Sequence, residues 1–328
     1  MLQAVDVPVL IIFFNRPDMV SKVYEQVKKA KPTKLFLYQD GAREGRLDDV
    51  ENVEKCRKVF ENTIDWDCEV HHLYQTRNYG CDPSEYIAIK WFFEHVEYGI
   101  ILEDDDVPSI SFFSYCKELL EKYKDDNRIS TVCGMNHLEK YPKSNLNYDY
   151  FFSNASSISG WATWKRFVDL WDASYSFLDD KEKIKIMESN FLQSKTMKSD
   201  RVRFDLYLKK CKEHRDSGKE FYETLVSSTR LLTGGLSIFP CKNLIANIGN
   251  IGESTHGVPT IKLLPKATQK VFNIPTYELQ FPLRAPKEVC SDDKYVYKKE
   301  KLMTPTIFRY PFRWLECKIR AVLYKSGK

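Results

Sequence analysis

Short apolar runs alternate with helical stretches over the first 136 residues, and this alternation constrains the fold more than any other feature. Strands separated by helices form a mostly parallel sheet whose faces are covered by those helices. At 328 residues, 43% of them hydrophobic, the chain can bury one large α/β core with a smaller lobe attached. The predicted strands are Pro8–Phe14, Lys34–Gln39, Glu69–Gln75, Tyr98–Glu103 and Ile129–Met135.

After Asn136 the pattern is less regular. Residues 184–214 predict two helices around a polar break, which would form a helical lobe on the sheet. We expect a catalytic domain over residues 1–258 and an extension over residues 259–328, whose first part is rich in proline and would wrap the surface. The other predicted elements are strands at Tyr150–Asn154, Leu236–Phe239 and Leu244–Ile248, and a helix at Ala162–Trp171.

Overall charge and cysteine usage exclude several classes. Fifty Lys and Arg against 46 Asp and Glu leave a net charge of +4, so no overall field favours nucleic acid as a partner. The apolar run at residues 7–14 is well short of the ~20 residues of a membrane helix. No basic segment precedes it, so we expect a cytoplasmic protein. Nine cysteines without CxxC pairs are expected to be reduced thiols.

Four carboxylates, Glu103 to Asp106, follow the apolar strand residues Ile100–Leu102 without interruption. In an open parallel sheet, the loops beyond the carboxyl ends of the strands build the ligand crevice. Carboxylate oxygens there suit Mg²⁺ or Mn²⁺, which bind one or two protein carboxylates together with substrate phosphates. The alternative is a solvated acidic turn, stabilised by the dipole of the helix that follows.

The surroundings of this acidic run resemble a known family. Gly99–Asp105, followed by Pro108 and Phe112-Phe113, is similar to the metal segment of the N-acetylglucosaminyltransferase I family and its bacterial relatives in the GT-A superfamily. The resemblance covers roughly residues 7–257 and implies a GT-A (Rossmann-like) fold, a nucleotide-sugar donor, a divalent metal and usually inversion at the anomeric carbon. The other matching segments, in order, are residues 8–16, 39–40, 78–81, 91–94, 159–164, 240–249 and 255–257.

Within the acidic run, the resemblance assigns separate roles. Asp105 matches the direct metal ligand, so Mn²⁺ or Mg²⁺ is expected there, and Asp106 is an extra acid that leaves the choice of ligand open. Asp104 is expected to face the donor ribose or a metal-bound water. Glu103 is expected to fix the loop through contacts behind the metal.

Donor-binding residues are also expected after the first two strands. Asn15 and Arg16 follow the first strand, and Arg16 matches a family arginine near the phosphates, although a surface ion pair would explain it too. Asp40 matches the acid that accepts the uracil N–H and so favours a UDP-sugar. An Asp-Gly turn explains Asp40 almost as well.

Residues further along the chain are candidates for the acceptor side. Trp161 and Trp164 would stack on a sugar ring, although aromatic residues at this spacing are more often core. Glu223 lies where the family has its catalytic base and would accept the acceptor's proton, unless it is an ordinary exposed glutamate. His256 could approach the metal, but a hydrogen-bonded loop histidine is commoner.

The last twenty residues, 309–328, combine six Lys or Arg with one Glu and many aromatic and aliphatic residues. This composition suits a segment that lies in a membrane interface, where each basic residue adds ~1 kcal/mol near anionic lipid. It predicts peripheral contact with the inner face of the membrane. A C-terminal helix docked on the core is the alternative.

Together these features predict a metal-dependent, inverting glycosyltransferase that moves a sugar from a nucleoside-diphosphate donor to a hydroxyl of a glycan or lipid-linked acceptor. One alternative is a sugar nucleotidyltransferase, which should carry a Gly-rich loop after the first strand, where Phe13–Pro17 contains no glycine. Another is a non-catalytic protein that binds or lyses membranes, which the mean hydropathy of −0.46 opposes.

Overall fold

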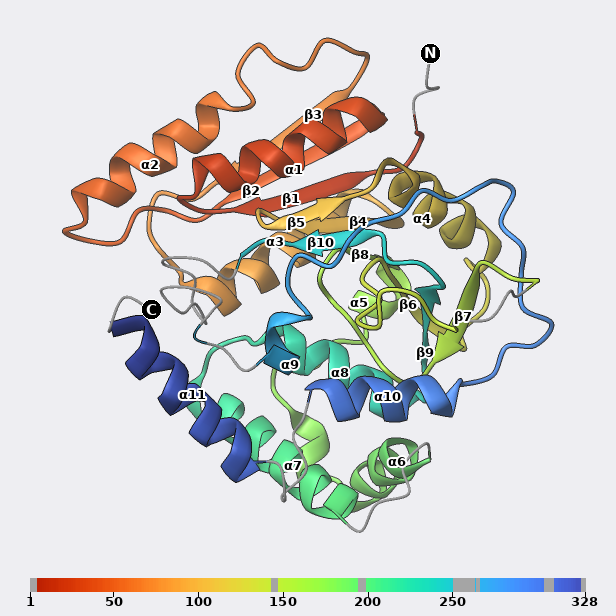
Figure 1. The fold of residues 1–328 in the computed structure, drawn as a ribbon. Helices are drawn as coiled ribbons and strands as arrows, with labels where there is room; N and C mark the ends of the chain where they lie inside the picture. Colours follow the sequence, from red (N-terminus) through yellow and green to blue (C-terminus); the bar gives the residue numbers. More distant parts are fainter. Residues whose placement is uncertain are drawn as a thin grey trace.

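An eight-stranded mixed sheet forms the centre of the computed structural model, which describes residues 5–142, 147–193, 199–249, 263, 266–303 and 310–325. Its order is β3-β2-β1-β4-β8-β6-β9-β7 (Figure 1). The first four strands are parallel neighbours, so their carboxyl ends meet at one edge. They are β1 (Val9–Phe13), β2 (Lys34–Gln39), β3 (Glu69–Tyr74) and β4 (Tyr98–Glu103).

The other half of the sheet contains the antiparallel pairings. β8 (Trp161–Trp164) runs against both β4 and β6 (Ile129–Cys133), and β7 (Tyr150–Ser153) runs against β9 (Leu236–Pro240). With β6 and β9 parallel, four of the seven pairings are parallel. The predicted α/β fold, a mostly parallel sheet flanked by helices, is therefore confirmed.

A separate two-stranded ribbon lies next to the acidic segment. β5 (Asp106–Pro108) pairs antiparallel with β10 (Ile245–Asn247), and the register places Asp106 opposite Asn247. This ribbon fixes the chain directly after β4, so the acidic residues lie in an ordered loop and not in a free surface turn.

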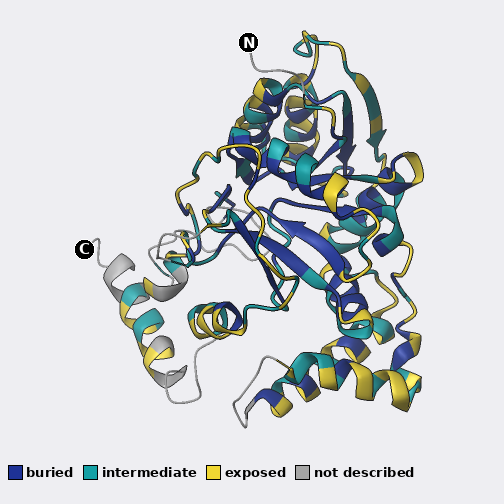
Figure 2. Cartoon of the chain, turned by 90° about the vertical axis from the view of Figure 1, so that its right-hand side faces the viewer, coloured by how far each residue is buried: buried dark blue, intermediate teal, exposed yellow. Residues whose placement is uncertain are grey.

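Helices cover both faces of the sheet because its buried strands send alternate side chains to opposite sides. Ile11 of β1 packs in one core with Val23 and Leu119, whereas Leu10 packs in a second core with Ile89 and Leu225. Figure 2 shows the strands as a continuous buried layer beneath more exposed helices. The first face carries α1 (Pro17–Ala30), α2 (Leu47–Lys58) and α4 (Ile110–Lys122), and the second carries α3 (Cys81–His95), α5 (Lys165–Val168) and α8 (Tyr222–Thr233).

The predicted helical lobe is present and consists of α6 (Lys181–Leu192) and α7 (Ser199–Ser217), which pack on the second core beside a 3₁₀ turn at Ser176–Asp179. The C-terminal extension packs on the sheet and its helices. Glu278 accepts hydrogen bonds from the backbone N–H groups of Ile110 and Ser111, at 3.1 and 2.8 Å. The helices of the extension are α9 (Lys266–Gln269), α10 (Asp293–Met303) and α11 (Tyr310–Lys325).

The helix predicted at Ala162–Trp171 is wrong, because its first residues belong to strand β8 and only Lys165–Val168 is helical. β8 lies in the middle of the sheet, where residues three apart face opposite sides. Trp161 accordingly packs with the second core, while Trp164 packs with the first and donates from Nε1 to the Leu120 carbonyl at 3.0 Å. Trp161 is 0% exposed and Trp164 3%, so neither presents a ring face for a sugar.

α11 carries the basic aromatic tail and lies at the edge of the molecule in Figure 1. Four of its apolar side chains are about half exposed or more. Within the described part of the chain, no helix is both long and apolar enough to span a bilayer. The exposed side chains are Phe312, Trp314, Leu315 and Ile319.

Candidate functional site

Arg16, at the end of β1, meets two of the acids that follow β4. Its Nε lies 3.1 Å from Asp104 Oδ2, and its Nη2 contacts both Asp104 and Asp105, at 3.0 Å from Asp105 Oδ2. Burial lowers the pKa of Arg16, but the two carboxylates outweigh that effect and raise it. Arg16 therefore stays charged, and its buried Nη1 has no partner among the described residues.

Asp106 is held by backbone and amide donors. Its Oδ2 accepts from the Gly160 N–H at 2.7 Å, and its Oδ1 accepts from Asn247 Nδ2 at 3.1 Å. Only 1% of Asp106 is exposed, so it joins β10 and the start of β8 to the acidic loop and is poorly placed as a metal ligand. Burial, followed by the charge of Asp105, raises the pKa of Asp106 to about 8.

Asp105 is the acid best placed to meet a bound ligand. Asn247 Nδ2 donates to its Oδ1 at 3.0 Å, and Arg16 contacts its Oδ2. A Cβ added to Gly249 would come within 1.7 Å of Oδ2, so only glycine fits beside this carboxylate. Each carboxylate oxygen accepts about two bonds, which leaves Asp105 with further capacity.

Glu103 faces α8 and α3 on the opposite side of the loop. The Tyr222 hydroxyl, from the first turn of α8, donates to Glu103 Oε1 at 2.6 Å. Burial raises the pKa of Glu103 well above its ordinary value, and the charge of Glu85 raises it further. For Glu85, burial is again the largest cause, and nearby acids including Asp82 and Glu223 help to raise its pKa to about 8.

These residues form what we call the acidic cluster, which consists of Glu85, Glu103, Asp104, Asp105, Asp106 and Glu223. Burial raises the pKa of Asp104 to about 6 even though Arg16 binds it directly. Glu223 is exposed, next to Tyr222 in the first turn of α8. The cluster thus concentrates carboxylates around one arginine, and each added negative charge raises the cost of ionising the next.

The acidic cluster suits a divalent cation bound together with a diphosphate. In the described part of the chain, no three His, Cys, Asp or Glu side chains form a preformed metal site. Mg²⁺ and Mn²⁺ do not require one, since they keep waters and take phosphate oxygens as ligands. Asp105, with Glu103 behind it, could provide the carboxylate oxygens for such a cation. His256 lies outside the described residues.

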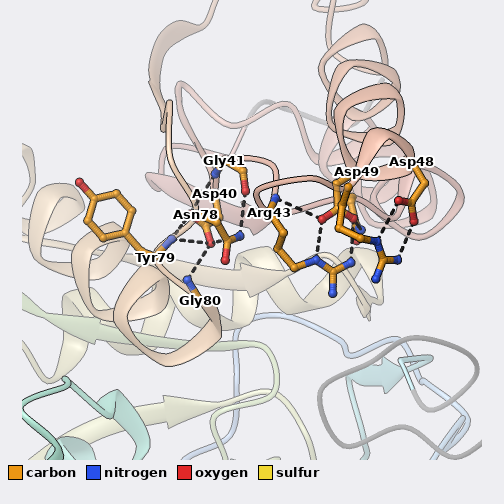
Figure 3. A network of polar contacts seen from close by, with 10 residues as sticks. Asp40, Gly41, Arg43, Asp48, Asp49, Asn78, Tyr79 and Gly80 are labelled. Carbon is orange, nitrogen blue, oxygen red and sulfur yellow. Dashed lines mark hydrogen bonds and ion pairs between the residues drawn. The ribbon is translucent and has the colours of Figure 1, made fainter.

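Asp40 is fully engaged with the turn that leads into α3 (Figure 3). It is 5% exposed and accepts from the backbone N–H groups of Gly41, Tyr79 and Gly80, at 2.9 to 3.2 Å, and from Asn78 Nδ2 at 2.9 Å. These donors fill the four acceptor positions of a carboxylate. The structure thus gives Asp40 the turn role and leaves no free acceptor for a uracil N–H.

The side chain of Asn15 is also bound to another residue of the protein. Its Nδ2 donates to Asp49 Oδ1 at 2.7 Å, and Asp49 in turn accepts from Arg43 Nε and Nη2, at 2.5 and 2.7 Å (Figure 3). The side chain of Asp49 is 0% exposed. Asn15 therefore anchors the start of α2 to the end of β1.

Sequence reasoning missed Glu85, Tyr222 and Asn247. Glu85 appeared to be a polar position on a helix, and only the turn through residues 78–80 brings that helix to the acidic edge. Asn247 lies about 140 residues after Asp106, so their contact depends on the β5–β10 pairing. The one signal in the sequence for Tyr222 was that it directly precedes the candidate base Glu223.

No protein-family model matches the chain, and a search of curated proteins finds no match. Among solved structures, apo UDP-glucose pyrophosphorylase is similar at 9% identity and a TM-score of 0.36, over 73% of this chain and 93% of that one. UDP-glucose pyrophosphorylase complexed with UDP-glucose is similar at 8% identity and a TM-score of 0.30, over 50% of this chain and 78% of that one. 4-Diphosphocytidyl-2C-methyl-D-erythritolsynthase from Anaerococcus prevotii DSM 20548 is similar at 11% identity and a TM-score of 0.28, over 62% of this chain and 84% of that one. At such TM-scores, these likenesses carry no information about the reaction.

The raised pKa of Glu85 predicts how stability depends on pH. Between its ordinary value of 4.5 and about 8, the folded protein holds a proton that the unfolded chain has lost. The folded state then binds more protons, so the free energy of unfolding falls as pH rises through this window. We expect Glu85→Gln to reduce this fall in urea unfolding without added metal, but not to abolish it, since Glu103 still titrates. The control is Glu213→Gln on the exposed face of α7, and an unchanged slope in Glu85→Gln would contradict the assignment.

Proposed function

We propose that this chain is a metal-dependent glycosyltransferase whose donor is a nucleoside-diphosphate sugar; the family resemblance, and not Asp40, favours a UDP-sugar. The observation that carries the proposal is the acidic cluster at the carboxyl edge of β1 and β4, where Arg16 is the one cation that bonds to Asp104 and Asp105 in the described residues. A metal ion bound there would supply positive charge to the carboxylates. The diphosphate would supply oxygen ligands to the metal. The resemblance to the N-acetylglucosaminyltransferase I family independently favours the same reaction.

Residues of the chain divide the work of such a transfer. Asp105 would hold Mg²⁺ or Mn²⁺, which stabilises the negative charge of the departing diphosphate when bound. Glu103, fixed by the Tyr222 hydroxyl, orients the loop behind it. Arg16 keeps Asp104 and Asp105 in place and brings a positive charge to the edge where the diphosphate would bind.

Glu223 is the proposed general base. It lies exposed in the first turn of α8, beside the residue that bonds to Glu103 and close enough to Glu85 to affect its pKa. In an inverting transfer, an acceptor hydroxyl oxygen attacks the anomeric carbon, the bond from that carbon to the diphosphate breaks, and the base takes the hydroxyl proton. The acceptor would be a hydroxyl of a glycan or a lipid-linked glycan.

The alternative, a sugar nucleotidyltransferase, is the class to which the UDP-glucose pyrophosphorylases named above belong. Such an enzyme needs backbone N–H groups to surround a triphosphate, for which a Gly-rich loop is suited. Here the chain passes from β1 to α1 through Phe14, Asn15 and Arg16, with no glycine. The two classes differ in product, because transfer or hydrolysis of a UDP-sugar releases UDP, whereas nucleotidyl transfer from UTP releases pyrophosphate.

We predict that the chain releases UDP from a UDP-sugar in the presence of Mn²⁺ or Mg²⁺, and that Asp105→Asn abolishes this release. The substitution removes a charged ligand but keeps the shape of the side chain, so the fold should persist. Release of UDP and of pyrophosphate is measured side by side over a panel of nucleotide sugars and nucleotides. Asp125→Asn, at an exposed position, is the control. Pyrophosphate as the product would favour the alternative, and near-native UDP release by Asp105→Asn would contradict the metal site.

Glu223→Gln tests the base separately from donor binding. Losing a general base slows transfer by ~10²–10⁴-fold, and mainly in kcat, because the interaction belongs to the transition state. UDP affinity, measured by calorimetry with metal present, should change little, because Glu223 is exposed on α8 and is not one of the proposed donor-binding residues. A transfer rate close to that of wild type would remove Glu223 from the mechanism.

We also propose that α11 holds the protein against an anionic membrane surface. Phe312 (73% exposed), Leu315 (50%) and Ile319 (51%) recur at helical spacing, and Lys318 lies 5.5 Å from the centre of the Trp314 ring. Apolar side chains next to basic ones match an interface of acyl chains and anionic headgroups. This placement would bring the enzyme to a lipid-linked acceptor.

The double variant Phe312→Ser, Ile319→Ser should reduce sedimentation with vesicles that contain phosphatidylglycerol, while UDP release from soluble donor stays unchanged. Leu170→Ser removes a similarly exposed apolar side chain (56%) elsewhere and is the matched control. Equal sedimentation of the double variant and wild type would contradict the membrane contact.

A further inference from the structure

Two basic side chains, the buried Arg230 of α8 and the partly buried Lys299 of α10, bond to carbonyls two residues apart in the chain. Arg230 is 7% exposed and donates from Nη2 to the Asn154 carbonyl at 3.0 Å, while its buried Nε has no partner. Lys299 Nζ donates to the Ser156 carbonyl.

Other buried polar atoms surround this pair. Nδ1 of His137, just after β6, is buried without a partner, and burial together with the charge of Lys299 lowers the pKa of His137. The thiol of Cys133 is also close, since both Arg230 and Lys299 act on its pKa. We call Arg230, Lys299, His137 and Cys133, with the carbonyls of Asn154 and Ser156, the cation pocket.

Within the described ranges, neither Arg230 nor Lys299 forms an ion pair with a carboxylate. Glu300, the acid next to Lys299 in sequence, bonds to Arg203 at 3.1 Å, and its charge also acts on Lys299. Carbonyl oxygens satisfy hydrogen bonds but do not cancel charge, and an uncompensated buried charge is strongly destabilising. Burial and the charge of Arg230 bring the pKa of Lys299 down to about 8, whereas the guanidinium of Arg230 cannot lose its proton.

Two arginines elsewhere bond to carboxylates. Arg43 forms two hydrogen bonds with the buried Asp49, and Arg16 bonds to Asp104. Arg230 and Lys299, by contrast, bond to carbonyl oxygens. We propose that this pocket binds a phosphate group.

A phosphate group fits the donors that remain. Arg230 and Lys299 bond to carbonyls two residues apart, and Arg230 Nε and His137 Nδ1 are buried without partners, so these groups together could donate to one tetrahedral dianion. Glu223 and Arg230 are seven residues apart on α8, which places them on the same face and about 10 Å apart along the axis. The phosphate could thus belong to a substrate that also reaches the acidic cluster, or it could be free inorganic phosphate.

The test is calorimetric titration of the full chain with inorganic phosphate, at constant ionic strength set with chloride. Wild type should bind phosphate saturably, and Lys299→Met should weaken binding about tenfold or more, since a hydrogen bond to a charged group is lost. Lys298→Met, which removes the exposed neighbouring lysine, should bind like wild type. No saturable binding to wild type, or equal binding to Lys299→Met, would overturn the proposal.

Two further arms strengthen the test. Lys299→Met should fold, because it removes one of two like charges, and Lys299→Arg should retain binding because it keeps the charge.

A hexose phosphate that binds more tightly than inorganic phosphate identifies a substrate site, and the reverse order identifies a site for the free ion. UDP affinity should be the same in Lys299→Met and wild type. A loss of UDP affinity in Lys299→Met would contradict a phosphate pocket that is separate from the donor site. No sugar donor or metal is used with phosphate, so the result does not depend on the transferase reaction.

Discussion

The crowding of carboxylates after β4 is the constraint that organises this molecule. Each acid is held by a group from a distant part of the chain: Asp104 by Arg16 at the end of β1, Asp106 by Asn247 of β10 and the Gly160 N–H before β8, and Glu103 by Tyr222 of α8. The acids cannot be buried without these donors. The loop after β4 therefore draws the parallel half of the sheet, the β5–β10 ribbon and α8 to one place.

The donors restrain the carboxylates but do not neutralise them. Arg43 lowers the pKa of the buried Asp49, as expected of a carboxylate with its own cation. Burial instead raises the pKa of Glu85, Glu103, Asp104 and Asp106, and Arg16 reaches only part of the cluster. Asp49 is thus matched with a cation and Asp40 is saturated with N–H donors, whereas the acidic cluster has one arginine for several carboxylates. Such imbalance is typical of sites that receive a charged ligand.

How much of this follows from the sequence depends on the range of the interactions. β1 and β4 were predictable because each is a largely buried apolar run, and the position of the acids followed from where β4 ends. The segment at Trp161 was misassigned because aromatic residues three apart suit a helix, whereas a central strand buries both of its faces. Asp40 matched a donor-binding acid in its sequence neighbourhood, but the four N–H donors that occupy it come mostly from residues 78–80. The roles of Glu85 and Asn247 were not predictable, since they depend on contacts between distant segments.

α8 connects the acidic cluster with the cation pocket, and the direction of its dipole stabilises the charges in both. Its amino end, with partial positive charge, points at Glu103 through Tyr222, and its carboxyl end, with partial negative charge, carries Arg230 in the last turn. The dipole thus lowers the cost of the carboxylates at one end and of the buried guanidinium at the other. The reversed helix would raise both costs. Because a helix is rigid over this length, the separation of about 10 Å between Glu223 and Arg230 is set by the backbone. Any molecule that reached both ends would therefore have to match a fixed distance between its own charged groups.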